Sequence, residues 1–101
     1  MPKKYILNEK GGPVLEPDIL KWAEWFENLD NRCVKNDLIG GTHISTVFLG
    51  LDHSFGGSEP VLWETMIFNN KKLVGWQDRY SSKEEALIGH QKAVDLVGET
   101  L

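Results

Sequence analysis

Hydrophobic positions along the chain follow two periods, and each period predicts a different kind of element. Residues 42–51 and 61–68 are dominated by β-branched, aromatic and aliphatic side chains, which is typical of β-strands. The first of these runs ends abruptly in Asp52-His53, and Gly56-Gly57 follows almost at once. Residues 33–39 predict a weaker strand, residues 73–80 predict the last strand, and residues 5–7 predict a short additional one.

Turn-forming residues separate the four later strands. Gly40-Gly41 is a suitable two-residue hairpin turn, and Asn69-Asn70-Lys71 predicts a second turn. Short links of this kind join neighbouring antiparallel strands. We therefore expect a four-stranded antiparallel meander.

Two segments show the helical period instead. In residues 17–30, Pro17 suits the first turn, Asp18 favours the positive end of the helix dipole, and apolar side chains recur at helical spacing: Ile19, Trp22, Ala23, Phe26 and Leu29. The stretch Ser81-Ser82-Lys83-Glu84-Glu85 is a capping box that opens a second helix ending near Gly98. The apolar arc of this helix holds Ala86, Leu87, His90, Ala93, Val94 and Val97.

The predicted element order is β-α-β-β-β-β-α, an α+β fold in which two amphipathic helices accompany a four-stranded antiparallel sheet. The chain has 101 residues, so we expect a single domain over residues 1–101. Both sets of alternating residues in the strands are apolar, whereas two short helices cover one face of such a sheet. We therefore expect another chain to close the second face, and a homodimer is the simplest arrangement.

Composition narrows the classes of function. The chain is 41% hydrophobic and 26% charged, which is typical of a globular protein. A net charge of −4, with scattered lysines, argues against binding to nucleic acid. No apolar run reaches the ~20 residues of a membrane helix, and no signal peptide is recognisable, so we expect a cytoplasmic protein without a membrane partner. A single cysteine, Cys33, excludes an intramolecular disulfide and a cysteine-cluster zinc site.

Glu64 interrupts an otherwise apolar strand. If the following turn has two residues, even positions on this strand face odd positions on the next, and Glu64 shares a face with Arg79. A carboxylate half-buried among apolar neighbours needs a partner, so we predict a Glu64–Arg79 ion pair. A one-residue bulge would reverse the parity.

His90 lies at the centre of the second helix's apolar arc, and Ile88 lies opposite. One interpretation is a general base or metal ligand in a semi-buried cleft. The other, which we favour, is a core histidine whose ring nitrogens are hydrogen-bonded. Both interpretations place His90 against the sheet and leave Ile88 exposed.

Asp52-His53 combines a carboxylate and an imidazole, which together can bind zinc or activate water. A metal site needs three or four converging ligands, and the candidates are Asp52, His53, Glu64 and His90. Their spacings match no standard metal motif, so neither a metal nor another cofactor is predicted. The simpler interpretation is that Asp52 accepts turn hydrogen bonds and His53 is exposed to solvent.

Several stretches together resemble a family of small uncharacterised proteins encoded by bacteriophages, prophages and some bacteria. They are the run 45–53 with Phe55-Gly56, then 63–66, 79–81, 84–86 and Gly89-His90; the first helix, with residues 22–27, fits the same pattern. The resemblance covers about residues 16–97. It implies a mobile-element setting and a shared polar set: Asp52, His53, Glu64, Arg79 and His90. It implies no activity.

These observations favour a non-enzymatic interaction protein of phage or prophage type that binds a host or phage protein and interferes with a host system such as a defence pathway. Four tryptophans favour contact surfaces, and Trp63, Trp76 and Tyr80 are the predicted partner surface. The alternative is a small hydrolase or metal-binding enzyme that uses His53, Glu64, Arg79 and His90. An obligate homodimer with a structural role is a third hypothesis.

Overall fold

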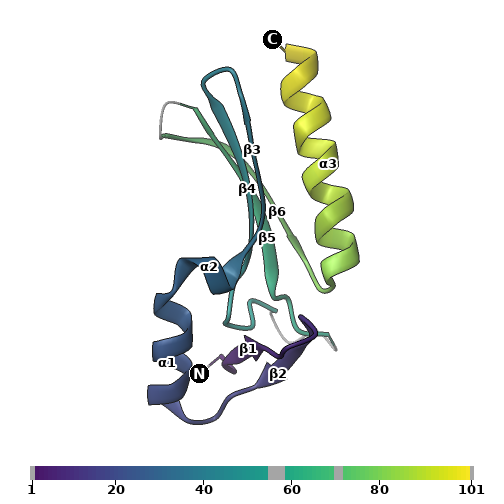
Figure 1. Ribbon diagram of the computed structural model, residues 1–101. Helices are drawn as coiled ribbons and strands as arrows, with labels where there is room; N and C mark the ends of the chain where they lie inside the picture. The colour runs from purple at the N-terminus through teal and green to yellow at the C-terminus, as the bar shows by residue number, and fades with distance from the viewer. Residues whose placement is uncertain (1, 55–58, 70–71, 101) are drawn as a thin grey trace.

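The computed structural model describes residues 2–54, 59–69 and 72–100. The elements, in chain order, are β1 (Tyr5–Leu7), β2 (Pro13–Leu15), α1 (Ile19–Glu27), α2 (Leu29–Arg32), β3 (Cys33–Ile39), β4 (Thr42–Phe48), β5 (Trp63–Asn69), β6 (Lys72–Tyr80) and α3 (Lys83–Thr100). This is the predicted α+β class, and Figure 1 shows the sheet with α3 along one side of it.

The large sheet has the strand order β3-β4-β5-β6 with every neighbouring pair antiparallel, as the meander prediction requires. Ile39 pairs with Thr42 across the two-residue Gly40-Gly41 turn, where Gly40 has a φ of 60°. Asn69 pairs with Lys72 at the other hairpin, and the intervening Asn70 and Lys71 lie outside the described residues.

The N-terminal third differs from the prediction in two elements. Pro13–Leu15 forms β2, which pairs with β1 as a separate two-stranded sheet. The segment predicted as one helix is two: Asp18 is the N-cap of α1, with its carboxylate accepting from the N–H groups of Leu20 and Lys21. Asn28 ends α1 in an extended conformation and caps α2 through its side chain. Each capping side chain satisfies N–H groups that the helix itself leaves free.

The capping box at the start of α3 is confirmed. Ser82 Oγ accepts the N–H of Glu85 at 3.1 Å and donates to Glu85 Oε1 at 3.0 Å. From this start, Ala86, His90, Ala93 and Val97 follow one another along the buried side of α3, while Ile88 is 60% exposed, as predicted. Leu87 was expected in the apolar arc but is 41% exposed, because the stripe that touches the sheet is narrower than the arc.

The core lies between α3 and one face of the sheet, in two clusters. Their buried members are Phe48, Leu62, Trp63, Tyr80 and Ala86 in the first, and Ile44, Ile67, Ala93 and Val97 in the second. Trp25 of α1 packs edge-on against Phe48, with ring centroids 5.7 Å apart. The N-terminal elements are therefore joined to the end of the core rather than laid over the sheet.

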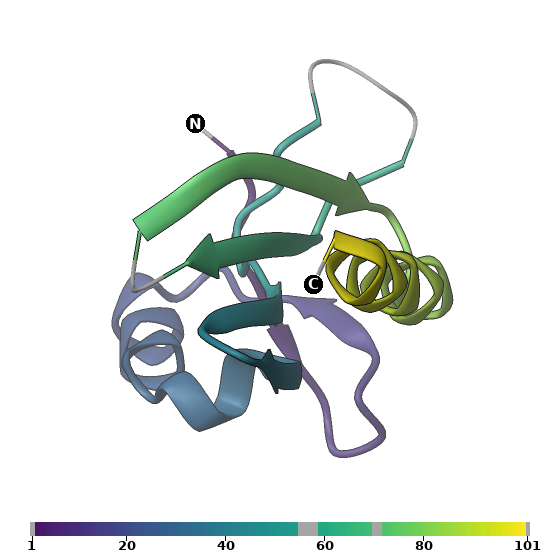
Figure 2. The same ribbon diagram turned by 90° about the horizontal axis from the view of Figure 1, so that it is seen from above.

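The opposite face of the sheet, called the open face below, carries the alternate residues of the strands. They are Asn36, Leu38, His43, Ser45, Val47, Glu64, Met66, Phe68, Gln77 and Arg79. Figure 1 shows α1 and α2 near the β1–β2 end of the molecule, and Figure 2 shows them on the side away from α3. Among the described residues, no helix covers the hairpin-tip half of this face. Leu62 has the same parity as Glu64 and Met66, but it precedes β5 and packs with Phe48 and Trp63 in the core.

Candidate functional site

The predicted Glu64–Arg79 ion pair is confirmed. Arg79 Nε donates to Glu64 Oε2 at 2.7 Å, and the two residues are direct partners in the β5–β6 register. The pairing is irregular between Met66 and Phe68, where β6 holds two more residues than β5. Two extra residues restore the alternation, so Glu64 and Arg79 still share a face. One extra residue would have placed them on opposite faces. Glu64 is 4% exposed, so the guanidinium stabilises a carboxylate that water hardly reaches.

His90 is fully buried against the sheet and connects elements that lie far apart in the chain. Its Nδ1 lies 2.6 Å from Thr46 Oγ1 on β4, and its Nε2 lies 2.7 Å from Asp37 Oδ2 on β3. Thr46 Oγ1 in turn lies 2.5 Å from Thr65 Oγ1 on β5. The favoured interpretation of His90 as a hydrogen-bonded core histidine is confirmed.

The hydrogen-bonding inventory sets the direction of this network. The Asp37 carboxylate only accepts, so Nε2 of His90 carries a hydrogen; in the neutral imidazole Nδ1 then accepts from the Thr46 hydroxyl. Thr46 is left to accept from Thr65. The order of groups, hydroxyl–imidazole–carboxylate, is that of a nucleophile activated by a base, but Thr46 and His90 are both 0% exposed and no substrate reaches them.

Tyr80 lies next to this network. Burial raises the pKa of its phenol; the Thr65 hydroxyl partly offsets that rise, and the Asp78 carboxylate adds to it. Although Thr65 is close enough to act on the pKa, the Tyr80 hydroxyl makes no hydrogen bond within the described residues. It packs directly against Gly89 of α3, where a Cβ would overlap the phenol.

Asp52 organises the loop that follows β4. Its Oδ1 accepts from the N–H groups of Ser54 at 2.8 Å and of Val61 at 3.0 Å, and the N–H of His53 donates to the Val61 carbonyl at 2.9 Å. Partial burial by itself raises the pKa of Asp52, but the hydrogen bonds from Ser54 and Val61 and the nearby His53 outweigh it, and the pKa is lowered. The interpretation of Asp52 as an acceptor of loop hydrogen bonds is confirmed, whereas His53 is half-buried rather than exposed.

The five polar residues of the predicted set do not share one site. Glu64 and Arg79 lie on the open face, His90 lies on the opposite face under α3, and Asp52 and His53 lie in the loop. Among the described residues, no group of three or more His, Cys, Asp or Glu side chains is close enough to hold a metal ion.

The predicted partner surface is also placed differently. Trp63 and Tyr80 are 2% and 8% exposed and belong to the first core cluster, and Trp76 packs against the second. Their strand parity turns them toward α3, so Trp63 and Tyr80 lie in the core instead of on the surface expected for a partner.

Sequence reasoning missed a stack of cations and rings on α1. Lys4 Nζ lies 6.0 Å from the Trp22 ring, Trp22 stacks on Phe26 at 4.6 Å, and Arg32 Cζ lies 3.9 Å from the Phe26 ring. The Trp22 indole donates to the Gly50 carbonyl at 3.0 Å. A Cβ on Gly50, whose φ is 76°, would lie 3.0 Å from Phe26. These contacts fix α1 to the segment after β4.

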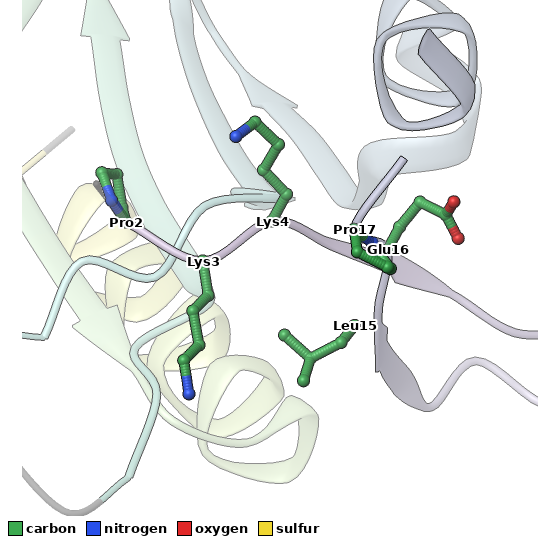
Figure 3. A pocket seen from close by; sticks show the side chains of 6 residues that line it. All are labelled: Pro2, Lys3, Lys4, Leu15, Glu16 and Pro17. Carbon is green, nitrogen blue, oxygen red and sulfur yellow. The ribbon is translucent and has the colours of Figure 1, made fainter. Parts of the chain in front are cut away.

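A surface cavity of about 350 Å³ lies between the N-terminal segment and the connection from β2 to α1. Figure 3 shows Pro2, Lys3 and Lys4 on one side and Leu15, Glu16 and Pro17 on the other, with the Leu15 side chain extending toward the N-terminal segment. Residues 14–20, which include part of the cavity lining, hold four large apolar side chains that are exposed to water: Val14 is 38% exposed, Leu15 54%, Ile19 57% and Leu20 78%. We call these four residues the N-terminal apolar surface.

No protein-family model, curated protein or solved structure matches the chain. Across the described residues, no helix is both long enough and apolar enough to span a lipid bilayer.

Proposed function

We propose that this chain is a non-enzymatic protein-binding protein that uses the N-terminal apolar surface to bind a partner. The observation that carries the proposal is the exposure of Val14, Leu15, Ile19 and Leu20, four large apolar side chains within seven consecutive residues beside a cavity. Large apolar side chains exposed in this number are typical of interaction sites, because their removal from water is favourable by about 25 cal/mol per Å².

The dispersal of the polar residues supports binding over catalysis. The alternative function, a small hydrolase or metal-binding enzyme using His53, Glu64, Arg79 and His90, requires these groups to converge on a substrate. Glu64 and His90 lie on opposite faces of one sheet, and each already has a charged or hydrogen-bonding partner. Such satisfied pairs stabilise a fold, and they leave neither Glu64 nor His90 free to act as general base.

The resemblance to phage and prophage proteins sets the kind of partner. A small protein in that setting acts in the cytoplasm of a bacterial host, so we propose that the partner is a host or phage protein. Interference with a host system such as a defence pathway is the consequence that we propose.

The test compares two variants with the same chemistry. Leu20→Asp places a charge in the N-terminal apolar surface, and Leu38→Asp makes the same change at a leucine on β3 that is equally exposed, at 73%. The tagged chain captures partners from host lysate, mass spectrometry identifies them, and calorimetry then measures the affinity of each purified pair. We expect Leu20→Asp to weaken binding at least tenfold and Leu38→Asp to leave it unchanged. Equal binding by wild type and Leu20→Asp would refute the proposed surface.

A further inference from the structure

The open face of the sheet carries a second surface at its hairpin-tip end, formed by two rows of side chains. The strand register aligns Leu38, His43 and Phe68 in the outer row. Leu38 is 73% exposed and His43 is exposed, and the His43 and Phe68 rings lie 6.4 Å apart. The next row aligns Ser45 and Met66, flanked by Asn36 and Gln77.

Neither row contains a lysine, arginine, aspartate or glutamate, although a quarter of the chain is charged. Two copies that each carry a net charge of −4 repel one another, and like charges brought together across an interface cost several kcal/mol. The uncharged rows are where two copies can approach without placing like charges opposite each other. Phe68, Met66 and the neighbouring Arg79 are of the residue types enriched in protein interfaces.

The chain exposes more surface than a compact monomer of the same mass does. A monomeric globular protein of this mass exposes about 5,800 Å², whereas this chain exposes 6754 Å². The excess of roughly 950 Å² is spread over the whole elongated chain, and it is larger than the roughly 800 Å² that each partner buries in a standard interface. The radius of gyration, 14.2 Å, also exceeds the value of about 12.7 Å expected for a compact chain of this length.

The edges of the sheet are less suited to pairing than its face. β6 is an outer strand, but Asp78 Oδ1 accepts the N–H of Arg79 at 3.0 Å, so this donor is not free to pair with another strand. β3, the other outer strand, has a bulge between Cys33 and Lys35. Bulges and charged side chains on outer strands are common devices against edge-to-edge association.

From these observations we infer that a second copy of this chain packs against the open face, around Leu38, His43 and Phe68, to form a two-fold symmetric dimer. A self-complementary patch closes such a dimer without a further gene product. The contact lies on the sheet, whereas the proposed partner surface lies on β2 and α1. Dimerisation and partner binding therefore use different residues and can fail separately.

Multi-angle light scattering over a dilution series, with sedimentation equilibrium for the dissociation constant, tests the dimer. We expect wild type to have twice the chain mass at high concentration, and Leu38→Asp to raise the dissociation constant at least tenfold. Leu20→Asp, an equally exposed leucine on α1, serves as the matched control and should dimerise as wild type does. Circular dichroism confirms that each variant is folded.

Three results would overturn the inference: a wild-type monomer at every concentration, a Leu38→Asp variant that dimerises normally, or a Leu20→Asp variant that alone becomes monomeric. The last result would move the self-contact to the N-terminal apolar surface. If wild type dimerises and both variants still bind the partner as wild type does, the proposed function is refuted and the dimer stands.

Discussion

At the scale of single residues, the contact with Tyr80, and not the helix that contains it, explains why position 89 is a glycine. Glycine inside a helix is destabilising by about 0.5–1 kcal/mol relative to alanine. At position 89, however, a Cβ would overlap the phenol oxygen and ring of Tyr80, whereas a Cβ at Gly98 of the same helix meets nothing within 4 Å. Close packing of α3 on β6 therefore requires the smaller residue.

Gly89→Ala should lower the free energy of unfolding by about 1–3 kcal/mol, because overpacking forces Tyr80 or α3 to shift. Gly98→Ala, the matched control, should raise it by up to about 1 kcal/mol through helix propensity alone. Urea unfolding followed by circular dichroism measures both. A stabilised Gly89→Ala variant would contradict the contact between Tyr80 and Gly89.

Asp52 gives a pH-dependent prediction. Its carboxyl has an ordinary pKa of 3.8, and folding lowers it. Its contribution is therefore fully present above that value and is lost as the pH falls through the lowered folded pKa. Asp52→Ala should destabilise the protein by about 1.5–3 kcal/mol at pH 7, the range for hydrogen bonds to a charged group. The difference from wild type should shrink below pH 4, and an unchanged difference in urea unfolding at pH 3 would contradict this account.

At the scale of elements, polar contacts determine which strands and helices are held together. The Glu64–Arg79 pair joins β5 to β6 beside the register irregularity, and the Thr65–Thr46–His90–Asp37 network joins β5, β4 and β3 to α3. Both are buried or half-buried, so each depends on all its members being paired.

Arg79→Met should cost about 1–3 kcal/mol, because it leaves Glu64 buried without a partner; the exposed third of the Arg79 side chain keeps the cost below that of a fully buried pair. The double variant Glu64→Leu with Arg79→Met should recover most of that loss, since two apolar groups need no partner. A double-mutant cycle of urea unfolding measures the coupling. Additive effects of the two substitutions would show that the pair is not coupled.

Thr46→Val keeps the shape of the side chain and removes the hydroxyl that joins Thr65 to His90. We expect a loss of about 1–3 kcal/mol, because the buried Nδ1 and the Thr65 hydroxyl each lose a partner. Long-range ¹H–¹⁵N spectra of wild type should show a hydrogen on Nε2 of the His90 ring and none on Nδ1. A ring with its hydrogen on Nδ1 would reverse the assigned direction of the network.

At the scale of the whole molecule, the chain is elongated, with principal extents of 44 × 28 × 25 Å. The N-terminal apolar surface and the uncharged rows of the open face lie on different elements, β2 and α1 for the first and β3 to β6 for the second. The two proposed contacts, one with a second copy and one with a different protein, therefore use different parts of the chain.

If the dimer forms, its thermal stability depends on concentration, because binding to the folded state alone stabilises it by mass action. The Tm of wild type should rise by several degrees between micromolar and submillimolar protein. The Tm of Leu38→Asp should stay constant over the same range. Differential scanning calorimetry at a series of concentrations decides, and a wild-type Tm independent of concentration would contradict dimerisation.

The sequence by itself determined what depends on local period and parity. The four strands of the meander, the Gly40-Gly41 turn, the capping box at Ser82 and the inward position of His90 follow from alternation, turn chemistry and helical projection, which act over a few residues. The Glu64–Arg79 pair was predictable for the same reason, since pairing across a hairpin links parity on one strand to parity on the next.

Only the tertiary structure decided which apolar residues are core and which meet solvent. Trp63 and Ile19 are both apolar residues in periodic segments, yet the first is 2% and the second 57% exposed, because α3 covers one face of the sheet and nothing described covers the start of α1. The partners of His90 were likewise beyond the sequence, since Thr46 and Asp37 lie 44 and 53 residues away along the chain. Contacts at such separations depend on how the elements pack, and no local period encodes that.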